Sequence, residues 1–253
     1  MVELFHHFLL PFLFLTGLVA GTVDAIAGGG GLISLPVLLG VGIPPHLALG
    51  TNKLQSSFGT LMAAHSYYRQ GLIDKTKVMF GLIFTFIGAI IGAITIQVLH
   101  GEVLKKIIPI LLLLILIYTL FSPRFGQIDR TPKISEKSFF VIFGLLLGFY
   151  DGFLGPGTGS FWVFAFMFFI GFNLVKATAY TKVFNLNTNL TALACFAIGH
   201  NIDYRIGLCM AAGQLIGGRL GAHFAVRKGA ALIRPIFISV VVVTMTTLFY
   251  KSY

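Results

Sequence analysis

The chain has 253 residues, of which 57% are hydrophobic and 10% are charged, and its mean hydropathy is +0.92. Soluble domains carry about 25% charged residues, so this composition excludes an ordinary water-soluble protein and predicts an integral membrane protein. The formal net charge is +10, but the basic residues are scattered through short polar segments. They therefore indicate positive-inside anchoring of a membrane protein rather than nucleic-acid binding.

The chain begins with an apolar stretch, residues 8–27, that we expect to be a membrane span. Glu3, His6 and His7 precede this stretch where a secretory signal would carry Lys or Arg. A cleavable signal peptide is therefore not expected.

A glycine-rich break, Gly28–Gly31, follows the first span, and the apolar segment after it, 32–43, has only 12 residues. Twelve helical residues reach about 18 Å, which is short of the ~30 Å hydrocarbon core of a bilayer. Longer helices are then expected at 47–66, 78–98 and 106–121.

The second half has the same plan after a polar linker, residues 123–137. A span at 138–154 leads into a second glycine-rich break, Gly155–Gly159, and then into a second short apolar segment, 161–172. The remaining predicted helices cover 176–199, 206–226 and 232–250.

An internal repeat explains this shared plan. The motif Gly17–Asp24 returns as Gly144–Asp151 at an offset of 127, and after a slip of two residues Lys53 matches Lys182. Chance rarely gives a register that holds over so many positions. The sequence therefore predicts an all-α polytopic membrane protein with about eight transmembrane helices and two short re-entrant or half-span segments. Its two tandem repeats are expected at residues 1–122 and 138–253.

The side of the membrane on which each loop lies depends on the two short segments. If they re-enter, loops 67–77, 122–137 and 200–205 share a side with both termini, whereas if they cross, the two repeats are inverted. The inverted arrangement gives the stronger asymmetry of Lys and Arg between the two sides, eleven against four. It requires 12 residues to cross the bilayer, however, so the length argument favours re-entrant segments.

Charged residues inside apolar segments are the first candidates for a functional site, because ionisable groups in a membrane are costly and usually functional. Two of the eight acidic residues, Asp24 and Asp151, lie within apolar spans, and they are repeat mates. Lys53 and Lys182 are mates as well. This relation predicts a site at the interface between the repeats. A carboxyl group in apolar surroundings favours its protonated form, so Asp24 or Asp151 is expected to bind a coupled proton.

The glycine-rich breaks suit anion binding, because glycine lets a ligand approach the main chain. A helix that starts after such a break also presents unpaired N–H groups and a positive dipole end. Close helix packing is the alternative role, and it is the favoured interpretation for glycines spaced four apart elsewhere in the chain. The expected donors to an anion lie at Gly30, Gly31, Thr158, Gly159 and Ser160.

Amide side chains cluster after each break. Asn52 and Gln55 share one helix face, and Asn185 and Asn189 share another, because residues three and four apart are neighbours on a helix. Such side chains are poor neighbours for lipid. They are expected to line a substrate pathway together with the two lysines, or alternatively to bond to other helices.

Arg219 lies in the apolar segment 206–226 and has Ile90 as its counterpart in the first half. A guanidinium group can clamp an oxyanion through two parallel hydrogen bonds. Arg219 could equally pair with Asp24 or Asp151 as a buried structural ion pair, and the sequence does not decide between these roles.

The stretch from Gly21 to Pro36, GTVDAIAGGGGLISLP, and the stretch Ala48–Gln55, ALGTNKLQ, resemble the sulfite exporter TauE/SafE family, also called the toluene-sulfonate uptake family. The second copy, Gly148–Ser160 and Lys176–Lys182, is similar to the second half of that family, so the likeness covers essentially the whole chain. It looks closest to the bacterial inner-membrane subgroup of probable transporters.

The second copy departs from the first at Pro156 and Thr158, which stand where the first copy has glycines. The two halves of the site are therefore not expected to be equivalent.

The resemblance implies a secondary transporter of small sulfur-containing anions such as sulfite, sulfonates or sulfoacetate, without fixing the substrate or the direction of transport. With the buried carboxyl groups, it predicts a proton-coupled transporter in the bacterial inner membrane. Its expected partners are the small anion, protons and the lipid bilayer, with a homodimer as the assembly to consider.

Two other functions compete with this prediction: a passive channel for anions or small solutes, and a non-transporting membrane assembly protein. An enzyme is not expected, because the sequence has no paired carboxylates at catalytic spacing, no His or Cys cluster and no nucleophile motif. No cofactor and no metal site are predicted.

Overall fold

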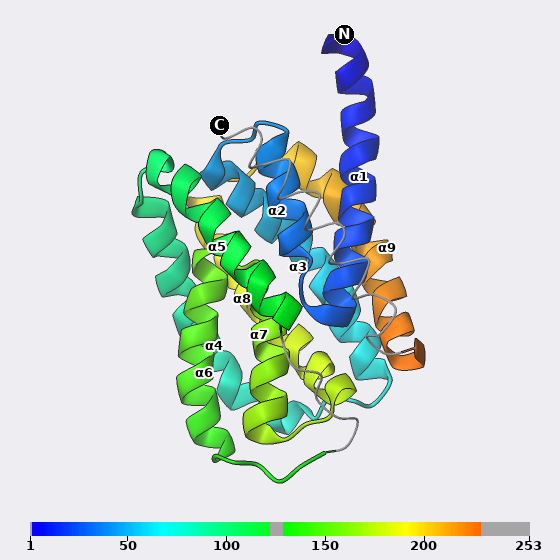
Figure 1. The fold of residues 1–253 in the computed structure, drawn as a ribbon, viewed down its shortest axis with the longest axis vertical. Coiled ribbons are helices and arrows are strands. Elements are labelled where there is room, and N and C mark those ends of the chain that lie inside the picture. Colours follow the sequence, from blue (N-terminus) through cyan, green and yellow to red (C-terminus); the bar gives the residue numbers. More distant parts are fainter. Residues whose placement is uncertain (1, 122–128, 229–253) are drawn as a thin grey trace.

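The computed structural model describes residues 2–121 and 129–228 (Figure 1). Regular structure in these two stretches is entirely helical, which confirms the all-helical prediction for the described part of the chain. The last predicted helix, 232–250, and part of the linker lie outside the described residues. The elements are α1 (Val2–Ala27), α2 (Gly31–Gly40), α3 (Pro45–Arg69), α4 (Lys75–Val98), α5 (Gly101–Phe121), α6 (Glu136–Phe153), α7 (Thr158–Ala165), the π-helix η1 (Phe166–Ile170), α8 (Leu174–Ile198) and α9 (Tyr204–Lys228).

Two short non-helical segments separate α1 from α2 and α6 from α7, where the sequence predicts the glycine-rich breaks. Gly28 and Gly155 adopt φ angles of +75° and +94° in these segments. A residue with a Cβ pays a steric cost in this left-handed region, and glycine does not. Glycine at these two positions therefore allows the backbone conformations that end α1 and α6.

α1 and α4 contain the two stretches of the described chain that are long and apolar enough to cross a bilayer, Phe8–Ala27 and Val78–Val98. Many of their large apolar side chains point away from the bundle. Such an exposed apolar surface suits lipid rather than water. The most exposed members include Phe8, Phe12, Leu15, Met79, Ile83, Ile91 and Ile94.

α3 and α8 show the opposite distribution, because they turn polar side chains inward. Polar groups avoid lipid and gather inside a membrane protein, so this distribution is consistent with a membrane protein. The number of helices that cross the bilayer stays a prediction. The buried polar residues are Thr51, Asn52, Lys53, Gln55, Ser57 and Thr60 of α3, and Thr178, Thr181, Lys182, Asn185, Thr188, Asn189 and Thr191 of α8.

Helices of the two sequence halves pack against each other: α1 lies against α9, α4 against α6 and α3 against α8. Spaced glycines bring the first two pairs close together. A Cβ added at Gly217 would come within 2.2 Å of the carbonyl oxygen of Leu18, and one at Gly88 within 2.5 Å of that of Leu145. Both distances are shorter than real contacts allow, so these glycines are needed for close helix packing.

Contacts between loops define one end of the bundle. His46 Nε2 lies 3.0 Å from the carbonyl oxygen of Leu99, and Asn201 Nδ2 donates to Gln97 Oε1 at 3.0 Å. The segments before α3, after α4 and before α9 therefore meet at one end, the end at which α1 starts in Figure 1.

Other contacts define the opposite end. The backbone N–H of Asp74 donates to Tyr180 Oη at 3.2 Å, and that of Arg130 donates to the carbonyl oxygen of Gly171 at 2.7 Å. The loop after α3, the linker before α6 and the segment before α8 therefore lie together at this end.

Loop 200–205 thus lies opposite loop 67–77 and the linker, and the expectation that the three share a side is wrong. The physical reason is the position of the first break. α1 ends inside the bundle rather than beyond it, and α2 turns back toward the end at which α1 starts (Figure 1). The loops lie as in the inverted alternative.

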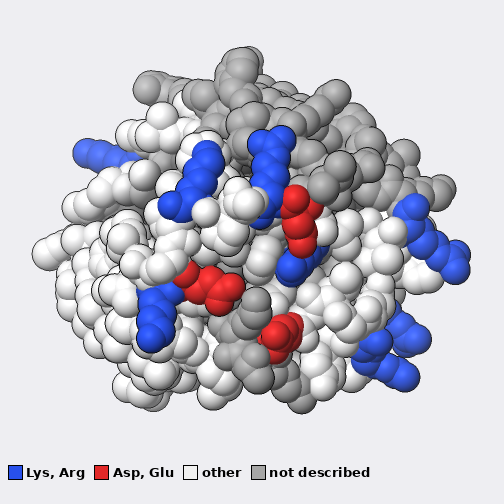
Figure 2. Space-filling view, turned by 90° about the horizontal axis from the view of Figure 1, so that it is seen from below, with Lys and Arg blue, Asp and Glu red and all other residues white. Residues whose placement is uncertain are grey.

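Basic residues are unevenly distributed between the two ends. Three of the described Lys and Arg residues, Lys105, Lys106 and Arg205, belong to the upper end of Figure 1. Figure 2 shows the lower end, with Lys and Arg side chains spread around the face. That end includes Arg69, Arg130, Lys133, Lys137, Lys176, Arg227 and Lys228.

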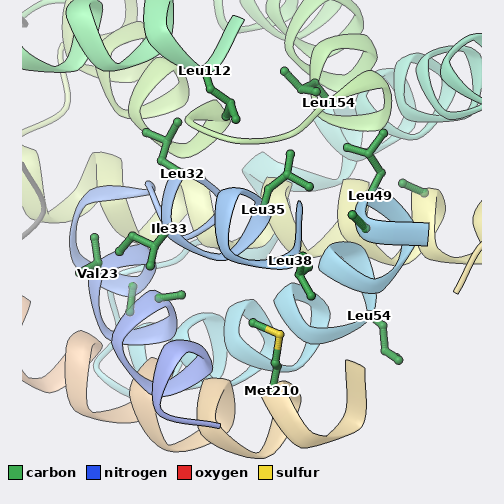
Figure 3. Close-up of a cluster of buried hydrophobic side chains, with 14 of the residues drawn as sticks. Val23, Leu32, Ile33, Leu35, Leu38, Leu49, Leu54, Leu112, Leu154 and Met210 are labelled. Carbon is green, nitrogen blue, oxygen red and sulfur yellow. The ribbon is translucent and has the colours of Figure 1, made fainter. Parts of the chain in front are cut away.

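α2 is enclosed by protein on its apolar sides. Its Leu32, Leu35 and Leu38 have no exposed surface, and α1, α3, α5 and α9 supply apolar side chains around them (Figure 3). The other short helix, α7, lies instead in an aromatic cluster in which the ring centroid of Trp162 is 4.9 Å from that of Phe184. This enclosure shields the broken helices from lipid, as irregular backbone at membrane depth requires.

Candidate functional site

The two glycine-rich breaks meet inside the bundle. A Cβ added at Gly28 would lie 2.4 Å from the Cα of Gly159, so the two backbones are in direct contact. Ser160 Oγ donates to the carbonyl oxygen of Ala27 at 2.9 Å across the same junction. The segments that the sequence singles out in each half are therefore adjacent in space.

Lys53 of α3 forms an ion pair with Asp151, which lies near the end of α6. Lys53 Nζ is 2.6 Å from Asp151 Oδ1 and 2.5 Å from the main-chain oxygen of Asp151. It also donates to Asn189 Oδ1 at 3.3 Å. The two charged side chains are only 2% and 4% exposed, so the pair is screened from water.

Lys182 of α8 pairs with Asp24, near the end of α1, in the same manner. Its Nζ lies 3.0 Å from Asp24 Oδ2 and also donates to the main-chain oxygen of Asp24. The side chain of Lys182 has no exposed surface, whereas that of Asp24 is 16% exposed.

Each lysine therefore binds the aspartate of the other sequence half, and each contacts a carbonyl in the last turn of a helix. Carbonyl groups at a helix C-terminus carry partial negative charge, so a cation is favoured there. The two pairs join the sequence halves through three buried charges, those of Lys53, Asp151 and Lys182, and the partly buried carboxylate of Asp24.

Further donors hold both carboxylates. Thr188 Oγ1 of α8 donates to Asp151 Oδ2, and the backbone N–H of Gly30 donates to Asp24 Oδ1 at 3.3 Å. Thr188 is not among the residues that the sequence predicts for the site. Its position six residues after Lys182 gives no signal of a contact with a carboxylate in α6.

A small polar pocket of about 20 Å³ lies between the breaks and the two ion pairs. Both aspartates line it, whereas of the two lysines only Lys53 does. The side-chain amide oxygen of Asn185 is buried and has no hydrogen-bond partner among the described residues. A buried acceptor without a partner is costly, so this oxygen marks a place where a water molecule or a ligand group that donates a hydrogen bond could bind. The lining residues are Asp24, Gly28, Gly31, Asn52, Lys53, Ser56, Asp151, Gly155, Gly157, Gly159, Asn185 and Asn189.

Only part of the predicted set of backbone donors is available. The N–H of Gly30 binds Asp24, and those of Thr158 and Ser160 donate to the carbonyl oxygens of Gly155 and Gly157 at 3.1 and 2.9 Å. The backbone N–H groups of the other two predicted donors make no hydrogen bond within the described chain, and both residues line the pocket. These two are Gly31 and Gly159.

The predicted amides divide between the pocket and the surrounding structure. Asn52 lines the pocket, but its Oδ1 accepts from Ser34 Oγ at 2.6 Å and from Gln55 Nε2 at 2.9 Å. Gln55 Oε1 in turn accepts from Gln214 Nε2 at 3.2 Å. Asn52 and Gln55 thus form a bonded chain between helices, which is one of the two roles that the sequence allows.

Arg219 is not part of this cluster. The structure places it in a separate pocket between α3 and α9, while Lys182 and Lys53 pair with the two aspartates that Arg219 could have joined. Neither expected role of Arg219, a clamp at the central site or a pair with Asp24 or Asp151, matches this position. No group of three or more metal-ligating side chains occurs in the described stretches.

Broken helices that meet inside a helical bundle, with buried charges beside them, are the architecture of a membrane transporter. The model of the sulfite exporter TauE/SafE family matches residues 13–248. The chain belongs to this family, which is a family of membrane transporters.

Relatives with curated names agree with this assignment. The chain is 44% identical over 230 residues to a probable membrane transporter protein of Haemophilus influenzae, which covers 91% of this chain and 90% of the relative. It is 39% identical over 245 residues to the probable membrane transporter protein YfcA of Escherichia coli, and this alignment covers 97% of this chain and 91% of the relative. It is 40% identical over 232 residues to the probable membrane transporter protein ORF9 of a Sinorhizobium species, and this alignment covers 92% of this chain and 89% of the relative. No solved structure matches the chain.

Proposed function

We propose that this protein is a secondary transporter that carries small sulfur-containing anions across the bacterial inner membrane together with protons. The observation that carries the proposal is the two Lys–Asp contacts at the junction of the two broken helices, one buried and one partly buried. Buried charges in membrane proteins are costly and mark ion or substrate pathways. The name of the family supports a sulfur oxyanion as the substrate.

Lys53 is the cation that an anion would meet in the pocket, because it lines the pocket and Lys182 does not. The backbone N–H groups of Gly31 and Gly159, which make no hydrogen bond within the described chain, are nearby donors for oxygen atoms. A sulfonate or a sulfite carries several oxygen atoms around one sulfur. These few donors and one ammonium group match that chemistry.

Coupling to protons follows from competition for Lys53. An anion that binds Lys53 displaces the carboxylate of Asp151, which the lysine now holds at 2.6 Å. A carboxylate left unpaired in a water-poor interior is strongly disfavoured, so it takes up a proton. The anion and the proton then cross together, and the site returns to its ion pair when both leave.

The pocket must enlarge for transport. A volume of about 20 Å³ holds about one water molecule and is too small for an anion with several oxygens. We propose that the two halves, residues 1–122 and 138–253, are repeats in inverted orientation that rock against each other around the site. The equivalent packing of α1 on α9 and of α6 on α4 supports this arrangement.

The sidedness of the protein follows from its basic residues. The lower end in Figure 2 carries most of the described Lys and Arg side chains. We place this end in the cytoplasm on the positive-inside rule. The end at which α1 starts then faces the periplasm.

The test is uptake of a radiolabelled sulfonate, such as methanesulfonate or sulfoacetate, by proteoliposomes with and without an imposed pH gradient. The sulfonate group remains ionised near neutral pH, so its own protonation does not imitate coupling. We expect saturable uptake that the gradient drives and a protonophore reduces to equilibration. Uptake that does not saturate and ignores the gradient would indicate a passive channel, and no uptake above protein-free vesicles would reject sulfonate transport.

A further inference from the structure

A second pocket, of about 560 Å³, lies between α3 and α9, apart from the lysine–aspartate cluster. Its two arginines and two histidines have exposed side chains. Met62 and Leu220 add apolar surface to the same pocket. The complete lining consists of Met62, His65, Ser66, Arg69, Gln70, Arg219, Leu220 and His223.

The pocket lies toward the lower end of the bundle. Arg69 occupies the last turn of α3, and Arg219 lies nine residues before α9 ends at Lys228. Both helices run downward to that end in Figure 1. The pocket is therefore close to the end of the bundle that carries most of the described Lys and Arg residues, at the level expected for the boundary between the bilayer and water.

The charge of this pocket is unbalanced. None of its lining residues is acidic, and the two aspartates inside the bundle are bound by Lys53 and Lys182. Residues 229–253, which follow α9, contain no Asp or Glu. A guanidinium group on an apolar helix requires a counter-charge, and neither the pocket lining nor the segment after α9 offers an acidic side chain.

We propose that the pocket between α3 and α9 binds a phosphate-type oxyanion, supplied by the headgroup of an anionic phospholipid or by a free anion of the same chemistry. The two guanidinium groups are planar donors that match oxyanions, and Ser66, Gln70 and the histidines add hydrogen-bonding groups. Basic pockets between membrane helices on the cytoplasmic side bind lipid headgroups in this way. The apolar surface of Met62 and Leu220 suits the glycerol and acyl parts of a lipid.

The site is independent of the proposed transport function, so ligand binding tests it directly. The protein is purified in an uncharged detergent and stripped of lipid, and its thermal unfolding is followed while dioctanoyl phosphatidylglycerol, dioctanoyl phosphatidylcholine or inorganic phosphate is added. We expect phosphatidylglycerol or phosphate to raise the unfolding temperature. If the natural ligand is a lipid, phosphatidylglycerol should raise the unfolding temperature at a concentration at least ten times lower than inorganic phosphate does. If it is a free anion, inorganic phosphate should raise the unfolding temperature at a concentration similar to that of phosphatidylglycerol.

Variants connect the response to the pocket. Arg219→Gln and Arg69→Gln should each raise the ligand concentration for half-maximal stabilisation at least tenfold. Arg205→Gln, an exposed arginine at the opposite end of α9, is the matched control and should respond like the wild type. If Arg219→Gln does not fold, Arg69→Gln, in the last turn of α3, decides the question. A response that both pocket variants retain, or no response of the wild type to any ligand, overturns the proposal.

Discussion

In both lysine–aspartate pairs, the lysine Nζ donates to the carboxylate and to the main-chain oxygen of the aspartate. The groups around the two pairs differ. Lys53 faces the central pocket and also holds Asn189, whereas Lys182 is fully enclosed and does not line the pocket. The carboxylate of Asp151 accepts a side-chain hydroxyl, and that of Asp24 accepts the backbone N–H of Gly30, which precedes α2. Equivalent positions in the sequence are therefore not equivalent in the site.

This difference suggests a division of roles. The Lys53–Asp151 pair has the position for exchange with a substrate anion, since its lysine is reached from the pocket. The Lys182–Asp24 pair holds the end of α1 and the start of α2 against α8. We therefore expect changes in the first pair to alter transport and changes in the second to alter stability more than transport.

Removal of both charges of one pair is the strongest challenge to this division. Lys53→Ala combined with Asp151→Ala should lower sulfonate uptake about 10- to 100-fold, because a hydrogen bond to a charged group contributes about 1.5–3 kcal/mol. Lys182→Ala combined with Asp24→Ala is the matched control and should keep more than a tenth of the wild-type rate. Neither double variant leaves a buried charge unpaired, which would itself destabilise the fold. Equal losses of uptake in the two variants would remove the distinction.

The contact between the two breaks predicts a loss of stability. Gly28→Ala places a Cβ 2.4 Å from the Cα of Gly159 and puts alanine at a φ of +75°. Overpacking of this kind costs about 1–3 kcal/mol, so the unfolding temperature in detergent should fall. Gly40→Ala, at the far end of α2 where no atom lies within 4 Å of the added Cβ, should leave that temperature nearly unchanged. A Gly28→Ala protein as stable as the wild type would contradict the contact.

The smallest effect is expected at the lower end, outside the site. Asp129 accepts from the backbone N–H of Asn173 at 2.7 Å and from Lys176 Nζ at 3.1 Å, and these contacts hold the pKa of its carboxyl group below the usual range. The stabilisation is therefore present above the unfolded-state pKa and is lost as the pH falls through the lower folded-state value. Asp129→Asn should cost less than about 1 kcal/mol, since the pair is exposed. Thermal unfolding at pH 7 measures this change, and a loss of several kcal/mol would show that Asp129 does more than anchor the start of α8.

The helices, the two breaks and the buried charges could be predicted from the sequence, because apolar length, glycine runs and isolated ionisable residues are local signals. The partners of those charges could not. Lys53 and Asp151 are 98 residues apart, and no spacing rule links a lysine to the aspartate of the other half. The sequence predicts that the two lysines bind a substrate anion. In the structure, each lysine forms an ion pair with an aspartate.

The position of the loops and of Arg219 depended on tertiary structure as well. The largely apolar stretch 8–27 is long enough to cross a bilayer, and its length gives no sign that α1 ends inside the bundle. Arg219 lies in α9, and the sequence does not specify which helices pack against α9, so the position of Arg219 outside the central pocket could not be predicted. Asn185 was predicted as a site residue, but only the structure shows that its amide oxygen has no partner in the described chain.

The most direct test of the account is the dependence of sulfonate uptake on the pH gradient in Asp151→Asn proteoliposomes, with Asp24→Asn as the matched variant. Asparagine cannot take up the displaced proton, so Asp151→Asn should still equilibrate the sulfonate down its own gradient but should no longer respond to the pH gradient. Asp24→Asn should keep the response. Uptake by Asp151→Asn that the pH gradient still drives would contradict the exchange of anion and carboxylate at Lys53.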